Sequence, residues 1–138
     1  TLKKKYDFRQ IEIVKDYRQE MPLVLCEGSK IQQVFFNIIK NASEAMMFSK
    51  KNNSPKLIIN IKKKKDKACI EIIDNGPGMD EETKKRIFEP FFTTKSIGKG
   101  TGLGLSVSYF IIVDDHNGEM EIESILGKGS KFIIKLPI

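Results

Sequence analysis

Hydrophobic residues recur at intervals of three and four between Ile31 and Met46, and this period predicts a long amphipathic helix. Ser29 stands three residues before Gln32, which is the capping-box pattern that opens a helix. The polar stretch after Phe48 interrupts the pattern. We therefore expect one helix from about residue 29 to about residue 48.

Shorter apolar runs bounded by turn residues predict strands and two further helices. The expected strands are 8–17, 23–26, 56–63, 67–74, 119–125 and 131–136, and the expected helices are 80–88 and 103–113. Asp80 is the expected N-cap of the first of these helices, and 89–101 has no period and is expected to be a loop. Short turns join neighbouring strands, which favours hairpins and a mixed sheet. The predicted fold class is α+β, with two layers: a mixed, mostly antiparallel sheet covered on one face by three helices.

Composition indicates an ordinary globular domain. The 138 residues are 40% hydrophobic and 30% charged, which suits one domain, and no apolar run approaches the roughly 20 residues of a membrane span. The N-terminus has no apolar signal segment and resembles a cut through a longer protein, and two isolated cysteines suit a cytoplasmic setting, so we interpret 1–138 as one cytoplasmic domain of a larger parent. Whether that parent is anchored in a membrane stays open.

Cys26 and Cys69 lack metal-ligand spacing and are expected to be buried apolar side chains.

The net charge of +6 does not by itself indicate a nucleic-acid partner. The lysines gather at the N-terminus and at residues 62–67, without interleaved aromatic residues. We interpret the second group as a solvated hairpin turn. The domain is expected to be a monomer that contacts neither nucleic acid nor a membrane.

Six of the ten glycines lie between residues 74 and 106. A glycine-rich loop that leads into a helix, as at 98–104, presents backbone N–H groups to an anion. Two familiar phosphate motifs are absent: Gly100, not Ser or Thr, follows Lys99, and no dinucleotide-binding register fits the run. Taken alone, the run is equally compatible with a flexible linker.

Two further groups of polar residues occupy positions where chemistry is plausible. Asp74 ends an expected strand, where its carboxylate could accept a hydrogen bond from an adenine amino group or close a turn by an Asx hydrogen bond. Asn37, Asn41 and Glu44 share one stripe of the long helix, beside its apolar face. Amide oxygens on that stripe suit Mg²⁺, and an ordinary helix surface is the alternative.

Five ordered motifs together resemble the ATP-binding catalytic domain of two-component sensor histidine kinases, a branch of the Bergerat-fold ATPases that includes gyrase, Hsp90 and MutL. "NIIKNASEA" resembles the asparagine box, "DNGPGM" and "GKGTGLGLS" the two glycine boxes, and "FEPFFTTK" the phenylalanine box. "GKGSKFIIKLP" is similar to the closing strand of the family. The resemblance covers roughly residues 23–138, and the form of its phenylalanine box points to the kinases in particular.

The resemblance implies roles for individual residues. Asn41 would bind a Mg²⁺ ion that bridges the phosphates, and Asn37 and Lys95 would complete the catalytic set. Asp74 would recognise the adenine amino group. Phe88, Phe91 and Phe92 would anchor a lid. The residues implied to surround the ATP are Asn41, Ala45, Asp74, Gly76, Gly78, Met79, Phe91, Thr94, Lys95, Gly98, Lys99, Gly100, Thr101, Gly102, Leu103, Gly104, Leu105 and Ser130.

The chain departs from the family pattern in places that bear on the reaction. Ser130 stands where the family usually has threonine. Hydrolytic relatives carry a glutamate one turn before the metal asparagine, and here Asn37 occupies that position, which cannot act as a general base. The single histidine, His116, lies at a helix-to-strand corner and is expected to be structural and not a phosphoryl acceptor.

Three hypotheses follow from the resemblance. The first is a histidine kinase catalytic domain that binds Mg·ATP and donates the γ-phosphoryl group to a histidine on a separate helical dimerisation domain of the same parent protein, with a response regulator downstream. The second is an ATP-hydrolysing switch of the gyrase, MutL or Hsp90 type, which the residue at position 37 disfavours. The third is a degenerate module that only binds nucleotide.

Overall fold

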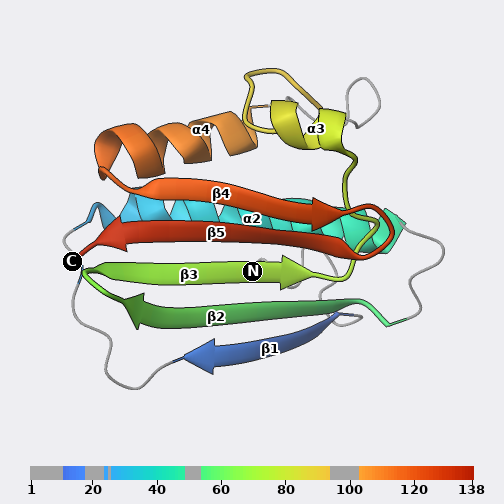
Figure 1. The fold of residues 1–138 in the computed structure, drawn as a ribbon, viewed down its shortest axis with the longest axis horizontal. Helices are drawn as coiled ribbons and strands as arrows, with labels where there is room; N and C mark the ends of the chain where they lie inside the picture. The colour runs from blue at the N-terminus through green and yellow to red at the C-terminus, as the bar shows by residue number, and fades with distance from the viewer. Residues whose placement is uncertain (1–10, 18–23, 25, 49–53, 94–102) are drawn as a thin grey trace.

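The computed structural model describes residues 11–17, 24, 26–48, 54–93 and 103–138, which contain a five-stranded sheet in the order β1-β2-β3-β5-β4. The strands are β1 (Glu12–Tyr17), β2 (Lys56–Lys64), β3 (Lys67–Asp74), β4 (Glu119–Ile125) and β5 (Gly129–Pro137). Only β1 and β2 pair in parallel among these strands, and the other three pairs are antiparallel. Figure 1 shows β5 inserted between β3 and β4, so the last strand of the chain lies inside the sheet.

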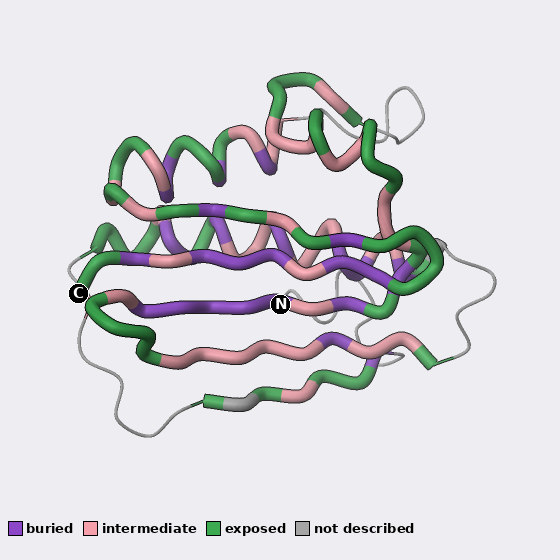
Figure 2. Tube along the Cα trace, viewed as in Figure 1, coloured by how far each residue is buried: buried purple, intermediate pink, exposed green. Residues whose placement is uncertain are grey.

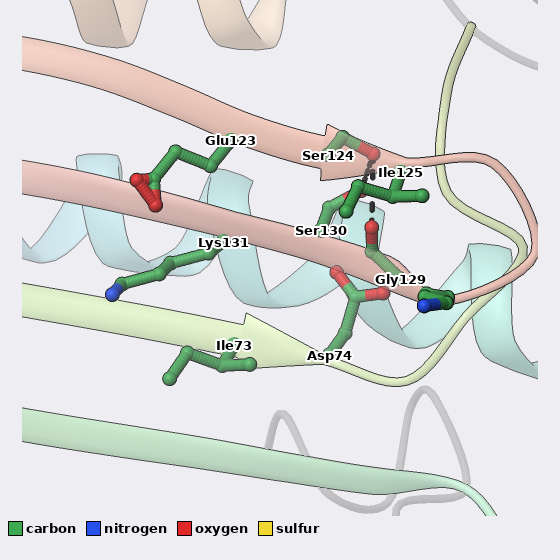
Figure 3. Close-up of a pocket in the computed structure, with 9 residues that line it drawn as sticks. Ile73, Asp74, Glu123, Ser124, Ile125, Gly129, Ser130 and Lys131 are labelled. Carbon is green, nitrogen blue, oxygen red and sulfur yellow. Dashed lines mark hydrogen bonds between the residues drawn. The ribbon is translucent and has the colours of Figure 1, made fainter.

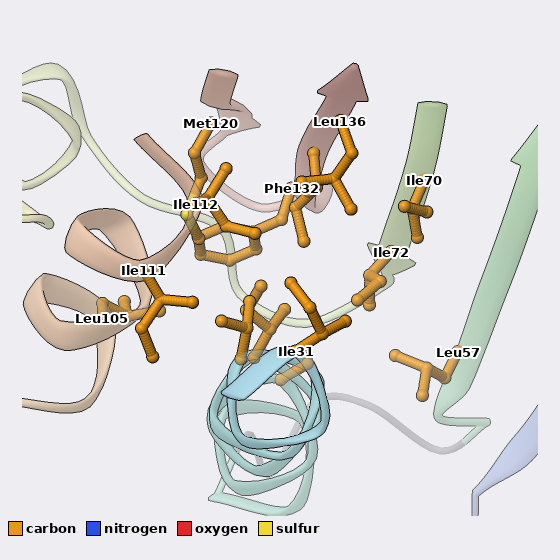
Figure 4. Close-up of a cluster of buried hydrophobic side chains, with 14 of the residues drawn as sticks. Ile31, Leu57, Ile70, Ile72, Leu105, Ile111, Ile112, Met120, Phe132 and Leu136 are labelled. Carbon is orange, nitrogen blue, oxygen red and sulfur yellow. The ribbon is translucent and has the colours of Figure 1, made fainter. Parts of the chain in front are cut away.

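The helices lie on one face of this sheet, which confirms the predicted α+β class (Figures 1 and 4). The long helix is α2 (Gly28–Phe48). The shorter ones are α3 (Glu81–Arg86) and α4 (Gly104–Phe110), and α4 continues as a π-helical turn, η2 (Ile111–Asp115).

The hydrophobic core fills the space between the sheet and these helices (Figures 2 and 4). Val34 and Ile38 of α2 are fully buried against the sheet, as the three-to-four spacing predicts. Alternate residues of β3 and β5 face the same core, among them Ile72 and Ile134. Residues one position along these strands therefore face the opposite side of the sheet.

That opposite face, on which none of the described helices lies, carries a network of paired charges. Glu71 of β3 lies between Lys131 Nζ at 2.9 Å and Lys62 Nζ at 3.5 Å. Burial raises the pKa of Glu71, but the hydrogen bonds from Lys131 and Asn60 outweigh it and lower the pKa overall. The long lysine side chains thus cover a buried carboxylate on the face that is free of helices in the described part of the chain.

Several element boundaries differ from the sequence prediction. Helix α2 begins at Gly28, and the amides of Lys30 and Ile31 both donate to Glu27 O at 3.0 Å, so Ser29 lies inside the helix and not at its cap. The predicted strand 23–26 is wrong where it is described, because Val24 and Cys26 lie outside any strand.

The other deviations are smaller. Helix α3 ends at Arg86, two residues early, although Asp80 caps it as predicted by accepting from Thr83 N at 2.8 Å. The predicted helix 103–113 extends to residue 115 through its π-helical turn. The first part of the predicted strand 8–17 and much of the loop 89–101 lie outside the described residues.

The two cysteines differ from each other. Cys69 is buried as predicted, whereas Cys26 is exposed, because the chain leaves the core just before α2 starts. The lysine turn is confirmed: Lys65 and Asp66 close the β2–β3 hairpin, are both exposed, and Lys65 adopts φ +59°.

Candidate functional site

Three polar residues form a row across the ends of three adjacent strands. Asp74 of β3 pairs with Ser130 of β5, and Ser130 pairs with Ser124 of β4. Figure 3 shows Ser130 between the other two. By the alternation of the strands, all three face the helical layer, in line with Ile72 and Phe132 of the core. Their exposed fractions are only 7% to 9%.

Burial controls the charge of Asp74. Desolvation raises the pKa of Asp74 to about 6, and the backbone amides of Gly76 and Ser130 oppose this by hydrogen bonding to the carboxylate. Gly76 N donates to Asp74 Oδ1 at 2.9 Å. This is the Asx hydrogen bond that the sequence left as an alternative, and it is present. The carboxylate can still accept further hydrogen bonds, because it has about four acceptor positions.

Ser124 is the centre of a buried hydrogen-bond cluster. Its hydroxyl donates to Gly129 O at 2.9 Å and accepts from Met79 N at 2.8 Å. A third contact, of 2.9 Å, joins Ser124 Oγ to Ser130 Oγ. Ser124 lies in none of the predicted motifs, and its only sequence signal is a small polar residue two positions before a glycine turn.

Glycines allow the loop after β3 to approach the β4–β5 turn closely. A side chain at Gly78, where φ is +70°, would place its Cβ 2.1 Å from Ile125 O. A side chain at Gly129, where φ is +119°, would place its Cβ 2.1 Å from Asp74 O. The loop is also bonded to the turn directly, because Gly127 N donates to Pro77 O at 2.7 Å. The loop that contains the first glycine box is therefore packed directly against the turn before β5.

Helix α2 contacts the loop after β3 near its C-terminal end. A Cβ at Gly76 would lie 3.4 Å from Met46 Cγ and 2.9 Å from Asp74 Oδ1, so only glycine leaves room for the carboxylate there. Ala45, another predicted site residue, directly precedes Met46 on this helix and is half-buried. The end of α2 thus lies beside the first glycine box.

Nearer its middle, α2 contacts the start of α4. Asn37 Nδ2 donates to Gly104 O at 3.1 Å and to Ser108 Oγ at 3.2 Å. Asn41 lies one turn further along the same stripe and is half-buried. Because Asn37 joins the two helices, the stripe faces the end of the second glycine box. The polar stripe of α2 that carries Asn37 and Asn41 therefore lies at the edge of the core, next to α4.

The phenylalanine box is anchored by two of its three rings. Phe88 packs against Tyr109 with a ring-centroid distance of 5.0 Å and against Phe132 at 6.4 Å. The Arg86 guanidinium lies 4.6 Å from the centre of the Phe92 ring. Phe91 is 73% exposed, and its role in anchoring a lid stays a prediction.

The remaining predicted site residues fall into two groups. Leu103 precedes α4, and Leu105 is buried against the core. The other predicted residues of the lid and of the second glycine box lie outside the described residues, and they are Thr94, Lys95, Gly98, Lys99, Gly100, Thr101 and Gly102.

His116 joins the end of η2 to the beginning of α2. Its Nε2 accepts from Glu27 N at 3.1 Å, and its Nδ1 lies 2.7 Å from Ile111 O. A carbonyl oxygen can only accept, so the ring carries its proton on Nδ1. These contacts fit the structural role that the sequence predicts for this histidine.

The described part of the chain contains neither a membrane-spanning helix nor a cluster of metal-ligating side chains. No helix there is long and apolar enough to cross a bilayer. No group of three or more His, Cys, Asp or Glu side chains is placed to hold a metal ion among those residues.

Comparison with known proteins identifies the relatives of this chain. It is 42% identical over 129 residues to sporulation kinase E of Bacillus subtilis, a match that covers 93% of this chain and 16% of the relative. It is 43% identical over 115 residues to sporulation kinase C of the same organism, covering 81% of this chain and 24% of the relative. The chain therefore spans a quarter or less of these curated relatives.

Solved structures give the same result at the level of the domain. The catalytic domain of histidine kinase ThkA superposes with a TM-score of 0.81 at 33% identity, covering 99% of this chain and 86% of that one. ThkA in complex with the response regulator TrrA superposes with a TM-score of 0.77 at 31% identity, covering 99% of this chain and 36% of that one. A family model matches residues 26–138, so the chain belongs to the histidine kinase-, DNA gyrase B- and HSP90-like ATPase family.

Proposed function

We propose that this chain is the catalytic domain of a sensor histidine kinase, which binds Mg·ATP and donates the γ-phosphoryl group to a histidine on a separate helical domain of its parent protein. The observation that supports this most strongly is the buried carboxylate of Asp74 at the end of β3, bordered by glycines that allow close backbone approach. A response regulator would receive the phosphoryl group afterwards.

The base of the nucleotide would bind against the row of Asp74, Ser130 and Ser124. A carboxylate there accepts a hydrogen bond from an exocyclic amino group, which adenine carries. Gly76 leaves space for the carboxylate, and Met46 of α2 borders the same place. The donor and acceptor chemistry of this end of the sheet therefore fits adenine.

The phosphates would lie toward the middle of α2 and the start of α4. Asn37 to Met46 is nine residues, or about 13 Å of helix at a rise of about 1.5 Å per residue, which separates the two glycine boxes along one helix. Asn41 lies between them, and its amide oxygen suits Mg²⁺, which takes few protein ligands when phosphates and water complete its shell. The bound Mg²⁺ would neutralise phosphate charge during transfer. Lys95 and the glycines of the second box would contact the phosphates.

Transfer to a protein, and not hydrolysis, fits the chemistry at position 37. The Asn37 amide nitrogen donates to Gly104 O and Ser108 Oγ, and an amide has no basic group that could activate water. Catalysis by this domain would consist of positioning the phosphates and stabilising their charge. A hydrolytic switch of the gyrase type lacks its base here.

A phosphotransfer assay tests the proposal. The domain is mixed with the helical acceptor domain of its parent protein and γ-labelled ATP, and acid-labile label on the acceptor histidine is expected. Asp74→Asn should abolish the label, while Lys64→Ala, on the exposed hairpin, is the matched control and should retain it. Steady-state ATP hydrolysis without any labelled histidine would instead support the hydrolytic switch.

A further inference from the structure

We propose that Ser124 sets the hydrogen-bond polarity of the base-binding site, so that the Ser130 hydroxyl can only accept from a bound purine. This inference rests on the proposed function and adds a residue that determines specificity. It follows from counting the protons and lone pairs of the two hydroxyl groups.

The Ser124 hydroxyl has one proton and two lone pairs. Its proton is committed to Gly129 O, 2.9 Å away, because a carbonyl oxygen cannot donate. One lone pair accepts from Met79 N at 2.8 Å, because a backbone amide can only donate. The contact to Ser130 Oγ therefore engages the remaining lone pair.

Ser130 must then be the donor across the 2.9 Å contact between the two hydroxyl oxygens. Its only proton points toward Ser124, and away from Asp74 on the other side of the row. Both hydroxyl groups belong to residues that are at most 9% exposed, so water has little opportunity to rearrange them. The Ser130 oxygen consequently offers lone pairs to the base site.

A purine edge at this position meets two acceptors, the Asp74 carboxylate and the Ser130 hydroxyl oxygen. An amino group at position 6 of the ring satisfies them. A keto oxygen at the same position, as in hypoxanthine, faces acceptors without a proton between them, and an unpaired buried polar group is costly. Ser124 thus acts as a positioning residue: it excludes 6-keto purines by withholding the Ser130 proton.

The test compares binding of ADP and of inosine diphosphate by calorimetry at pH 8, with Mg²⁺ present throughout. The two ligands share their phosphates and differ at position 6 and at N1, which is an acceptor in adenine and carries a proton in hypoxanthine, so the preference of each variant is always compared with that of the wild-type domain. In Ser124→Ala the Ser130 proton is released and can be donated to a keto oxygen. We expect the preference for ADP over inosine diphosphate to fall about five- to tenfold, the worth of roughly one hydrogen bond. Ser124→Thr keeps the hydroxyl and should restore most of the preference.

A structural effect alone would look different. If Ser124→Ala only removed the bonds to Met79 and Gly129, without changing the direction of the Ser130 hydrogen bond, it would weaken the binding of both ligands equally. An unchanged ratio of the ADP and inosine diphosphate affinities would therefore overturn the inference. Ser43→Ala is the matched control, because it also removes a buried hydroxyl, bonded to Ile39 O at 2.6 Å, at a position outside the row. It should lower the melting temperature and leave the ratio unchanged.

Ser130→Ala covers the case in which Ser124→Ala does not fold. Removing the accepting oxygen should also lower the preference for ADP, though by less than Ser124→Ala, because no new donor appears. A preference unchanged in Ser130→Ala would refute the inference as well. If the wild-type domain binds no ADP, the proposed function itself fails, and the two failures are therefore distinguishable.

Discussion

Replacing Asp74 by Asn should stabilise the nucleotide-free domain while it weakens ADP binding. Burial raises the pKa of Asp74 to about 6, from an ordinary value of about 3.9. Each pH unit of such a displacement is worth about 1.4 kcal/mol, so ionising this carboxyl in the folded domain costs roughly 3 kcal/mol more than in the unfolded chain. Asparagine avoids that cost and can still accept from Gly76 N, although with one oxygen in place of two.

The sign of the pH dependence follows from the direction of the displacement. Below about pH 4 the carboxyl is protonated in both states, and its contribution to stability is fully present. Between about pH 4 and pH 6 the folded state holds the proton longer, so the free energy of unfolding falls as pH rises. Above about pH 6 the loss is complete. The stabilisation by Asp74→Asn should therefore be about 1–3 kcal/mol at pH 7.5, or up to about 10 °C in melting temperature, and should vanish near pH 4.

Thermal melts of the two proteins at pH 4 and pH 7.5 make the measurement, with calorimetric titration of ADP beside them. Asp66→Asn, at the exposed hairpin turn, is the matched control and should change neither quantity. We expect ADP affinity in Asp74→Asn to drop at least about tenfold, since the amide presents a donor to the amino group. A lower melting temperature at pH 7.5, or the same difference at both pH values, would refute the reasoning.

Substitutions at three other residues, Gly78, His116 and Asn37, probe further contacts, with Gly127→Ala and Asn37→Ala for comparison. Gly78→Ala should lower stability by about 2–3 kcal/mol and reduce ADP affinity, because its Cβ would meet a backbone oxygen at 2.1 Å, whereas Gly127→Ala, which shares a positive φ (+85°) but has no atom within 4 Å, should cost only about 1–2 kcal/mol in thermal melts. His116→Ala should lose about 1–3 kcal/mol in urea unfolding, since two backbone groups lose their partners, and an unchanged midpoint would contradict the contacts at 3.1 Å and 2.7 Å. Asn37→Asp should bind ADP more weakly than Asn37→Ala, because both lose the donor but only the carboxylate sets negatively charged oxygens against the carbonyl at the start of α4, and the reverse order in titrations would show that this amide is not a donor.

Most helices and strands could be predicted from the spacing of hydrophobic residues and from turn residues. The predictions that are wrong include the start of α2 and the burial of Cys26. The helical period of α2 and the lysine turn of the β2–β3 hairpin carry their own signals. The exact start of α2 does not, because the amides of Lys30 and Ile31 donate to Glu27 O, so that Glu27 and not Ser29 precedes the first helical residue. The apolar neighbours of Cys26 predict a buried side chain, but the chain leaves the core there and Cys26 is exposed.

Some residues of the candidate site could be predicted from the sequence, and others depend on contacts between distant segments. The sequence motifs predict Asp74 and the glycines, because a motif consists of fixed residue types at fixed spacings that can be read along the chain. Ser124 could not be found from sequence, since its meaning depends on the register that sets β4 against β5 and β5 against β3. The donor role of Asn37 is likewise a property of the contact between α2 and α4 and not of the helix that carries it.

The insertion of β5 between β3 and β4 has a consequence for how the domain is made. Asp74 and Ser130 are register partners although 56 positions separate them in the chain (74 to 130). Until the last hairpin forms, β3 is an unpaired sheet edge, which is the kind of surface that favours aggregation. Pairing across such a separation forms slowly, because a long loop must close before any contact rewards it. During synthesis the proposed base site can exist only after β5 has emerged, so nucleotide can stabilise this domain only once that strand is in place.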